Sequence, residues 1–335
     1  MILVTGGTGL LGAHLLYKLV VQGKEVKAIH RDSSSFENVK NIFSFYSTSS
    51  EELFLKVIWV KADINDVPAL ELAFKNVTKV YHCAADLSFN ISNYNASRKV
   101  NVEGTANIVN LCLSNEVTKL CHVSSIATIG EEVIKPITEE TKWSPESNSN
   151  NIYAITKYDA ELEVWRGVQE GLSVVVVNPG VILGPGFWNS GTGEIFVKVA
   201  DGFRYYTSGT VGMIGVNDVV KSMILLMNSG IKNDQFILVS ENITYQELMQ
   251  NIIQVTGSKN TSKEIKKWQL LIVLKIDALL SFFNIRKRSL YKANVSSVFK
   301  NLVYDNSKIK KAVEIEFTPI VEVIKNVGFF FTKQY

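Results

Sequence analysis

Short apolar runs alternate with stretches of helical spacing through the first half of the chain. Six runs have the length of strands and lie at 2–4, 26–30, 57–61, 79–84, 120–124 and 174–178. Helical spacing fills most of the intervals, at 12–20, 67–74, 97–115 and 153–170. Strands that alternate with helices predict a parallel, doubly wound sheet with its ligand at the carboxyl ends of the strands. The Ser- and Asn-rich interval 32–52 is less regular, and we expect a surface excursion there.

The first apolar run leads directly into a glycine-rich turn. Gly6 permits the tight turn, Gly9 lets the backbone approach a ligand, and Gly12 lets the following helix pack on the strand. The free N–H groups and the positive dipole end of a helix N-terminus attract a pyrophosphate. The place of the glycine-rich turn between a strand and a helix favours dinucleotide binding over an ordinary turn. The residues expected to form this cradle are Gly6, Thr8, Gly9, Leu10, Leu11 and Gly12.

The pattern changes after about residue 182. A glycine-rich loop precedes an apolar helix near 194–200, and a strand near 236–239 is expected to return to the first sheet. We therefore predict an α/β protein with a Rossmann-type NAD(P)-binding domain over 1–182. A smaller, mostly helical substrate-binding lobe is expected over 183–335.

Composition narrows the classes of function. The chain has 335 residues, 46% hydrophobic side chains and a formal net charge of +3, so an ordinary core and no nucleic-acid partner are expected. Cys83, Cys112 and Cys121 lie in apolar contexts without metal-ligand spacing. We expect reduced thiols, no bound metal and a cytoplasmic protein. No secretory signal is expected, because the first residues already have the pattern of a core strand.

One segment has nearly the length and apolarity of a membrane span. Residues 268–285 are mostly apolar and the basic residues 286–288 follow, but Lys275 and Asp277 fall near the middle, where charge is costly. We expect helices that cap the lobe, without a transmembrane segment. Peripheral membrane contact through an apolar face with a basic edge is the alternative.

A second motif lies far downstream of the glycine turn. Tyr153 and Lys157 are four residues apart, so on one helix they share a face. A tyrosine hydroxyl ordinarily titrates near about 10. A nearby ammonium favours the phenolate, which suits proton transfer at neutral pH. The alternative, an amphipathic helix with exposed Tyr and Lys, is disfavoured by the glycine turn in the same chain.

The glycine turn and the Tyr-x-x-x-Lys pair together resemble the extended short-chain dehydrogenase/reductases, the group of NAD-dependent epimerases and dehydratases. The resemblance covers the chain from Met1 to about Asp218. Within that group, the stretch Asn178–Pro185 is most similar to dihydroflavonol reductases and 3β-hydroxysteroid dehydrogenases.

The resemblance implies roles for further residues. The second serine of the Ser124-Ser125 pair matches the catalytic serine, so Ser125 is expected to orient the substrate oxygen and Ser124 is the alternative. Asn101 matches an asparagine that shapes the active-site helix and a proton-relay water, and a purely structural role fits it equally well. Lys157 would also hold the nicotinamide ribose. The residues expected to line the cofactor are Asp63 and Ile64 at the adenine, Cys83, Ala84 and Ala85 at the ribose, and Pro179, Gly180, Val181 and Ile182 at the nicotinamide.

The end of the second strand indicates which cofactor is bound. NAD enzymes place an acid there for the ribose 2′-hydroxyl, whereas an arginine accommodates a 2′-phosphate. Here His30 occupies the acid position, Arg31 follows, and Asp32 comes later. This ending resembles NADPH-dependent dihydroflavonol-reductase relatives. We expect NADP(H), with NAD(H) as the alternative.

The lobe separates the candidate functions. Nucleotide-sugar epimerases and dehydratases usually carry an arginine before a Val-x-Asp, and the stretch Gly212–Asp218 has none. We therefore expect an oxidoreductase that acts on a carbonyl or alcohol of a small, largely apolar substrate. An epimerase or dehydratase with tightly bound NAD is the first alternative, and a non-catalytic NADP-binding sensor is the second. Eight aromatic residues either furnish an apolar pocket or belong to the lobe core: Phe89, Tyr94, Phe187, Trp188, Phe196, Phe203, Tyr205 and Tyr206.

Two predicted helices, 97–115 and 153–170, carry more apolar residues than one buried face requires. The resemblance implies that these helices pair across a two-fold axis as a four-helix bundle, so we expect a homodimer. The residues concerned are Val100, Ile108, Leu111, Ile155, Leu162 and Trp165.

Overall fold

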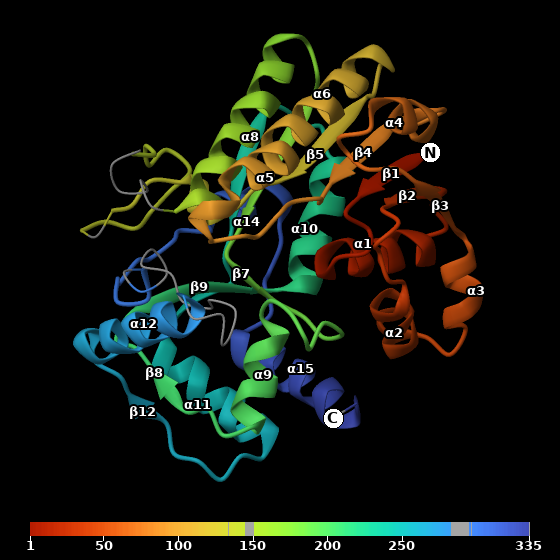
Figure 1. The fold of residues 1–335 in the computed structure, drawn as a ribbon. Helices are drawn as coiled ribbons and strands as arrows, with labels where there is room; N and C mark the ends of the chain where they lie inside the picture. The colour runs from red at the N-terminus through yellow and green to blue at the C-terminus, as the bar shows by residue number, and fades with distance from the viewer. Residues whose placement is uncertain (133, 145–150, 283–294, 296, 335) are drawn as a thin grey trace.

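A seven-stranded parallel sheet lies at the centre of the protein, in the order β10-β6-β5-β4-β1-β2-β3 (Figure 1). The computed structural model describes residues 1–132, 134–144, 151–282, 295 and 297–334. The predicted doubly wound sheet is confirmed. Its edge strand β10 joins it late in the chain, at the strand expected near 236–239. The strands are β1 (Ile2–Thr5), β2 (Val26–His30), β3 (Val57–Lys61), β4 (Lys79–His82), β5 (Lys119–Val123), β6 (Val174–Pro179) and β10 (Asp234–Leu238).

Helices cover both faces of this sheet. Side chains from α1 (Leu10–Val21), α2 (Glu37–Tyr46), α10 (Val216–Asn228) and α14 (Ser307–Val313) form the core on one face. Side chains from α4 (Val67–Phe74), α6 (Gly104–Ser114) and α8 (Ile152–Gln169) form the core on the other. The run of four valines in β6 is explained by this arrangement, because Val175 and Val177 face the first core and Val174 and Val176 face the second.

The interval 32–52 is not an irregular excursion, and this expectation was wrong. It forms α2 and the first half of α3 (Ser50–Leu55). Val39, Ile42 and Phe43 are completely buried against the sheet. Their i, i+3, i+4 spacing is that of an amphipathic helix, which the surrounding Ser and Asn residues obscure in the sequence.

The predicted helix at 97–115 is wound in three parts. It begins as α5 (Tyr94–Arg98), continues as a π-helical turn at Lys99–Glu103 and ends as α6. A single-turn π-helix inside an α-helix is rare and is frequent at functional sites. Asn101 lies in this turn and is buried.

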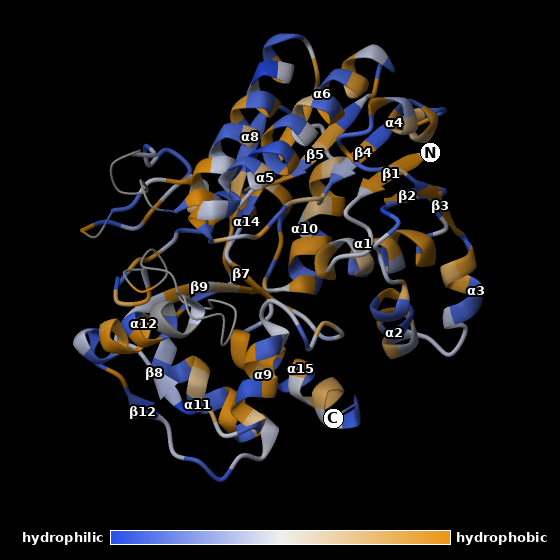
Figure 2. Cartoon of the chain, viewed as in Figure 1, coloured by the Kyte–Doolittle hydropathy of each residue, from blue (hydrophilic) through white to orange (hydrophobic). Residues whose placement is uncertain are grey.

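The lobe is built on a second, smaller sheet of three strands. It has the order β11 (Glu241–Thr244), β9 (Thr210–Gly215) and β7 (Val181–Leu183), and β8 (Tyr205–Tyr206) pairs separately with β12 (Lys263–Glu264). Helices that pack in or around the lobe are α9 (Gly193–Ala200), α11 (Tyr245–Thr256), α12 (Lys267–Phe282) and α15 (Ile320–Gln334). Much of α9 and α10 is apolar (Figure 2).

The chain crosses between the two parts more than once. Gly180 joins β6 of the first sheet to β7 of the second, next to the predicted boundary at residue 182. Later, α10, β10 and α14 return to the first sheet, and α15 packs in the lobe core. Of the membrane-like segment, residues 283–288 lie outside the described residues. Within the described part of the chain, no helix has both the length and the apolarity to cross a membrane.

Candidate functional site

The carboxyl edge of the central sheet gathers most of the predicted site residues. Because the strands are parallel, the segments that follow them all emerge at this edge, which is where ligands bind in doubly wound folds. The residues placed there directly after a strand are Gly6 after β1, Arg31 after β2, Asp63 after β3, Cys83 to Ala85 after β4, Ser125 after β5 and Gly180 to Ile182 after β6.

The glycine turn lies close to the segment after β4. Gly6 has a φ of +69°, and a methyl group built on it would lie 2.6 Å from the Ala84 nitrogen. A methyl group on Gly12 would lie 2.2 Å from the Gly6 carbonyl oxygen. Gly9 is exposed and precedes Leu10, the first residue of α1. The turn therefore leaves the helix N-terminus open to a ligand, which fits the pyrophosphate of a dinucleotide.

A buried chain of hydrogen bonds runs behind this turn. The Ala84 N–H donates to Thr5 Oγ1 (3.2 Å), and Thr5 Oγ1 lies 2.7 Å from His82 Nδ1. His82 Nε2 lies 2.9 Å from Thr105 Oγ1, which donates to the Asn101 carbonyl oxygen (2.5 Å). The Thr105 hydroxyl donates its only proton to Asn101, so it must accept a hydrogen bond from His82 Nε2–H. His82 Nδ1 is then unprotonated and accepts a hydrogen bond from the Thr5 hydroxyl. These bonds assign the His82 tautomer. Burial lowers the pKa of His82 to about 3, so the ring is neutral.

Asn101 continues this chain to the helix that carries Tyr153. Its Oδ1 accepts from the Asp86 N–H (2.7 Å), and its Nδ2 donates to the Asp86 carbonyl (3.0 Å) and to Thr156 Oγ1 (3.0 Å). Thr156 lies on α8 between Tyr153 and Lys157. Of the two roles expected for Asn101, these contacts describe the structural one.

Ser125, Tyr153 and Lys157 are brought together at the ends of β5 and α8. Burial raises the pKa of Tyr153, and a hydrogen bond with the Ser125 side chain lowers it. The expected lowering by Lys157 is not found. Lys157 Nζ instead donates to the Val123 carbonyl (2.7 Å), and burial lowers its pKa to about 8. The ring of Phe89 lies 5.4 Å from that of Tyr153.

The structure distinguishes the two serines. Ser124 Oγ donates to Glu161 Oε2 (2.6 Å) in a buried position, so this hydroxyl is committed away from the edge. Ser125 Oγ accepts from the Ala127 N–H (3.2 Å) and keeps its own proton for another acceptor. Of the two serines, Ser125 is therefore the one whose hydroxyl proton is not committed to Glu161.

Sequence reasoning missed Glu161 and the role of His82. Glu161 is buried on α8, one turn after Lys157. An acid four residues after the lysine, on the same helical face, was the available signal. His82 became meaningful only when β1 and β4 were paired, because its partners lie far away in the sequence.

The adenosine end of the candidate site carries one exposed arginine. Arg31 is exposed, and its backbone N–H donates to Ser34 Oγ (3.1 Å). Asp32, the competing acid, forms an ion pair with Lys61 (2.8 Å). Asp63 Oδ1 accepts from the Asn65 N–H (2.8 Å), which orders the loop after β3.

The aromatic residues are divided between the site and the core. Phe89 lies beside Tyr153, whereas Phe196 and Trp188 pack in the lobe core. Phe203 and Tyr205 are exposed on the lobe surface. Of the two alternatives, the lobe core accounts for Phe196 and Trp188, and the aromatics do not gather into one pocket.

The doubly wound sheet, the glycine turn and the Tyr-Lys helix define a Rossmann-type nucleotide-binding enzyme. The chain belongs to the NAD dependent epimerase/dehydratase family, whose model matches residues 2–238. This family membership makes it an NAD(P)-dependent enzyme.

The chain is similar to both reductases and epimerases. A protein of Synechocystis sp., provisionally named dihydroflavonol 4-reductase, is 27% identical over 98% of this chain and 93% of its own length. The crystal structure of gox2253 has a TM-score of 0.81 at 25% identity and covers 100% of this chain and 98% of that one. The UDP-glucose 4-epimerase of Thermotoga maritima, solved with UDP-glucose, has a TM-score of 0.78 at 21% identity and covers 99% of both chains.

Proposed function

We propose that the protein is an NADP(H)-dependent oxidoreductase that reduces a carbonyl group, or oxidises the corresponding alcohol, on a small and largely apolar substrate. The observation that supports this most is the cluster of Ser125, Tyr153 and Lys157 at the carboxyl edge, beside the glycine turn. Retention of both the tyrosine and the lysine argues against a non-catalytic sensor.

The side chains divide the reaction among them. A bound NADPH would provide the hydride for the carbonyl carbon, and the residues of the chain would do the rest. The Tyr153 hydroxyl donates its proton to the carbonyl oxygen, and the Ser125 hydroxyl orients that oxygen. Lys157 would hold the ribose hydroxyls of the cofactor, and its ammonium is positioned by the Val123 carbonyl (2.7 Å). The products are the alcohol and NADP⁺, and solvent returns the proton to Tyr153.

The alternative, a nucleotide-sugar epimerase or dehydratase, requires a cationic partner for the diphosphate. The residues before Val216 are Ile214, which is completely buried, and Gly215. Asp218 is occupied by the Thr318 backbone, whose N–H donates to it (2.8 Å). These residues support an apolar substrate rather than a sugar nucleotide.

Substitution of Tyr153 by Phe tests the proposed chemistry. Removal of the proton donor should reduce turnover by about 10²–10⁴-fold and leave the affinity for NADPH nearly unchanged. The measurement is NADPH oxidation with a panel of aromatic and alicyclic ketones and aldehydes. Tyr158→Phe is the matched control, because Tyr158 lies on the same helix and stacks on Trp143 instead (4.2 Å between rings). It should keep wild-type turnover.

Two results would contradict this proposal. Full turnover in Tyr153→Phe would remove the tyrosine from the reaction. Saturable thermal stabilisation by a UDP-sugar, several degrees above that given by NADP⁺ alone, would favour the epimerase function.

Substitution of Arg31 by Ala tests the choice of cofactor. We propose that Arg31 binds the 2′-phosphate, since its acidic neighbour Asp32 is paired with Lys61. The wild-type protein should bind NADPH more tightly than NADH. Loss of a charge-assisted bond of about 1.5–3 kcal/mol should weaken NADPH binding by roughly 10- to 150-fold and leave NADH binding unchanged. Calorimetry measures both affinities. A wild-type preference for NADH would indicate that Asp32, and not Arg31, interacts with the 2′ position of the ribose.

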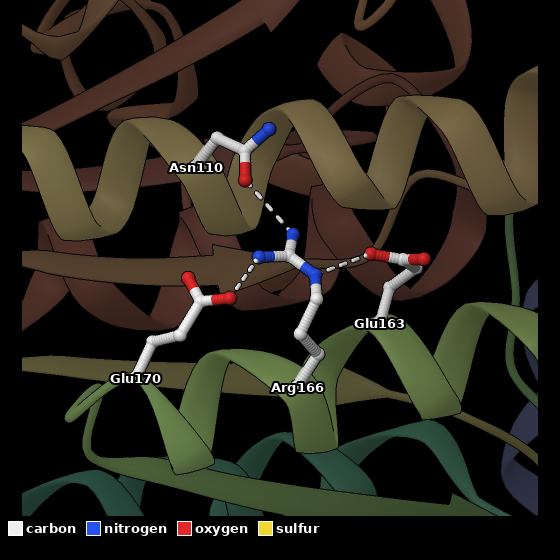
Figure 3. A network of polar contacts seen from close by, with 4 residues as sticks. All are labelled: Asn110, Glu163, Arg166 and Glu170. Atoms are coloured by element: carbon white, nitrogen blue, oxygen red, sulfur yellow. Dashed lines mark hydrogen bonds and ion pairs between the residues drawn. The ribbon is translucent and has the colours of Figure 1, made fainter.

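We further propose that the protein is a homodimer that pairs through α6 and α8. Arg166 fixes these helices to each other on their outer side (Figure 3). It donates to Glu163 and Glu170 on α8 and to Asn110 on α6, each at 2.8 Å. Leu162 lies on the same helix and is 50% exposed. This leaves an apolar residue on a rigid two-helix surface.

The apolar surplus on these helices is smaller than the sequence suggested. Ile108 and Leu111 are buried in the core of the protomer, and Val100 and Trp165 are partly buried against it. Leu162 is therefore the residue on which a helical interface depends most.

Substitution of Leu162 by Glu should convert the dimer to a monomer, because a charge would be buried at the symmetric contact. Light scattering at micromolar concentration measures the mass. Leu55→Glu is the control, since Leu55 is exposed on α3 at a distance from α8 in the sequence and the fold. A monomeric wild-type protein would refute the proposal.

A further inference from the structure

The lobe helix α12 presents apolar side chains outward. Trp268, Leu271, Ile272 and Ile276 follow the i, i+3, i+4, i+8 spacing of one helical face, and Val273 flanks them. These five side chains are between 37% and 59% exposed. Exposed apolar side chains gathered on one side of a helix, with Lys275 among them, favour an interaction site over an ordinary surface.

Lysines surround this apolar face. Lys263 on β12, Lys266 and Lys267 at the start of α12, and Lys275 on its exposed side are all solvent-accessible. Asp277, the acid on the same helix, is completely buried. Glu264 on β12 is exposed and offsets one of the four positive charges. The α12 face, defined as these five apolar residues with their four lysines, thus combines apolarity with positive charge.

We propose that the α12 face docks on an anionic lipid bilayer. A helix with an apolar face and a basic edge lies in the interface between headgroups and acyl chains, with its lysines near the phosphates. Tryptophan prefers this interface, so Trp268 would anchor the end of the helix. At 16 residues, α12 is suited to lie on a membrane rather than to cross it. In the view of Figure 1, α12 lies at the left edge of the lobe.

Vesicle co-sedimentation of the full chain tests this proposal. The protein should bind phosphatidylcholine vesicles that contain phosphatidylglycerol, and bind them more weakly without phosphatidylglycerol or at high salt. Ile272→Glu with Ile276→Glu should abolish binding. Lys266→Gln with Lys267→Gln should weaken it by more than tenfold, since each lysine near an anionic surface contributes roughly fivefold. Leu72→Glu is the matched control, because Leu72 is 60% exposed on α4, far from the lobe.

Brominated lipids give a second readout. They should quench the fluorescence of the wild-type protein, and the quenching should be lost in Trp268→Phe. Retained NADPH binding establishes that each variant is folded. Absence of binding to anionic vesicles by the folded wild-type protein overturns the proposal. Binding that does not depend on lipid charge or on salt also overturns it. A third contradicting result is a concentration-dependent increase in mass that the Ile272/Ile276 variant abolishes, because the α12 face would then bind a second copy of the chain.

A second inference comes from a different observation, the buried carboxylate of Glu161. Its Oε2 accepts from Ser124 Oγ (2.6 Å), Thr128 Oγ1 (2.9 Å) and Asn178 Nδ2 (3.2 Å). Its Oε1 accepts from Trp165 Nε1 (3.3 Å). A carboxylate, which only accepts hydrogen bonds, matches these four donors. The donors come from the end of β6, the segment after β5 and α8 itself.

This inference rests on the proposed function and deepens it. We infer that Glu161 is a positioning residue that holds Ser124 inward, so that Ser125 faces Tyr153. The Glu161 carboxylate also supports the ammonium of Lys157. It does not contact the reacting atoms. Its action goes through the serine pair and through the lysine one helical turn earlier.

The surroundings of Lys157 explain why a buried carboxylate is needed there. The titratable groups that face Lys157 are Tyr153 and Glu161 on α8, His82 and Cys83 at the end of β4, and His122 on β5. Burial lowers the pKa of Lys157 to about 8, while Glu161 and then Cys83 oppose this lowering. Burial keeps the two histidines uncharged and raises the pKa of Cys83. Glu161 is therefore the main support for the ammonium.

Glu161→Gln tests this role through the pH profile of kcat/KM. Without the carboxylate the pKa of Lys157 should fall further, so the alkaline limb should move to lower pH by about one unit. Glu161→Asp keeps the negative charge, so the alkaline limb of its pH profile should lie at the wild-type position. Thr128→Val removes one donor to Glu161 but no charge, so its limb should stay at the wild-type position.

The pH dependence of NADPH affinity provides a readout that does not need turnover, because Lys157 is proposed to hold the ribose. If no carbonyl compound is reduced by the wild-type protein, the proposed function fails, and this binding profile still tests Glu161. A Glu161→Gln profile that keeps its wild-type shape, with only a uniform loss at every pH, would overturn the inference and leave Glu161 a structural residue.

Discussion

Both halves of the candidate site depend on the buried hydrogen bonds that join Thr5, His82 and Thr105. These bonds connect β1, which leads into the glycine turn, to the helix that holds Asn101 and, through it, to α8. They form only when the imidazole is neutral and carries its proton on Nε2. Burial lowers the pKa of His82 to about 3 and so maintains that state at neutral pH. The spacing between cofactor cradle and catalytic helix is thus set by hydrogen bonds that carry no net charge.

The catalytic side is anchored in the same way, but around a charge. Glu161 collects donors from β6, from α8 and from the segment after β5, so the positions of Ser124 and Ser125 follow from one buried carboxylate. Such a group is costly to bury unless its hydrogen bonds are satisfied. Its cost is offset here by four donors and by the neighbouring Lys157. Polar groups behind the site, rather than those lining it, therefore fix its geometry.

The parts of the protein that were predictable from sequence are those encoded by local spacing. The glycines of the first turn, the Tyr153–Lys157 pair and the strands of the central sheet each need only their neighbours in the chain to be recognised. The helix α2 was missed because polar residues surround Val39, Ile42 and Phe43. The role of His82 depends on Thr5, 77 residues away, and no local pattern contains that pairing. The spacing of Glu161 from Lys157 is a local signal, but its partner Ser124 lies 37 residues away.

The residues at the central sheet concern the type of reaction, whereas the residues of the lobe concern the type of substrate. Hydride transfer at a carbon that bears oxygen is common to a carbonyl reductase and to an epimerase, so the residues at the carboxyl edge fit either one. The rest of the substrate must be recognised elsewhere. Where β9 runs into α10, the chain has Ile214 and Gly215 and no cation, while the Phe89 ring lies beside Tyr153. Among the described residues at that position, a diphosphate would lose hydration without gaining a charged partner, whereas an apolar carbonyl compound would lose little. The walls of the site, rather than Ser125, Tyr153 and Lys157, therefore support the proposed apolar substrate.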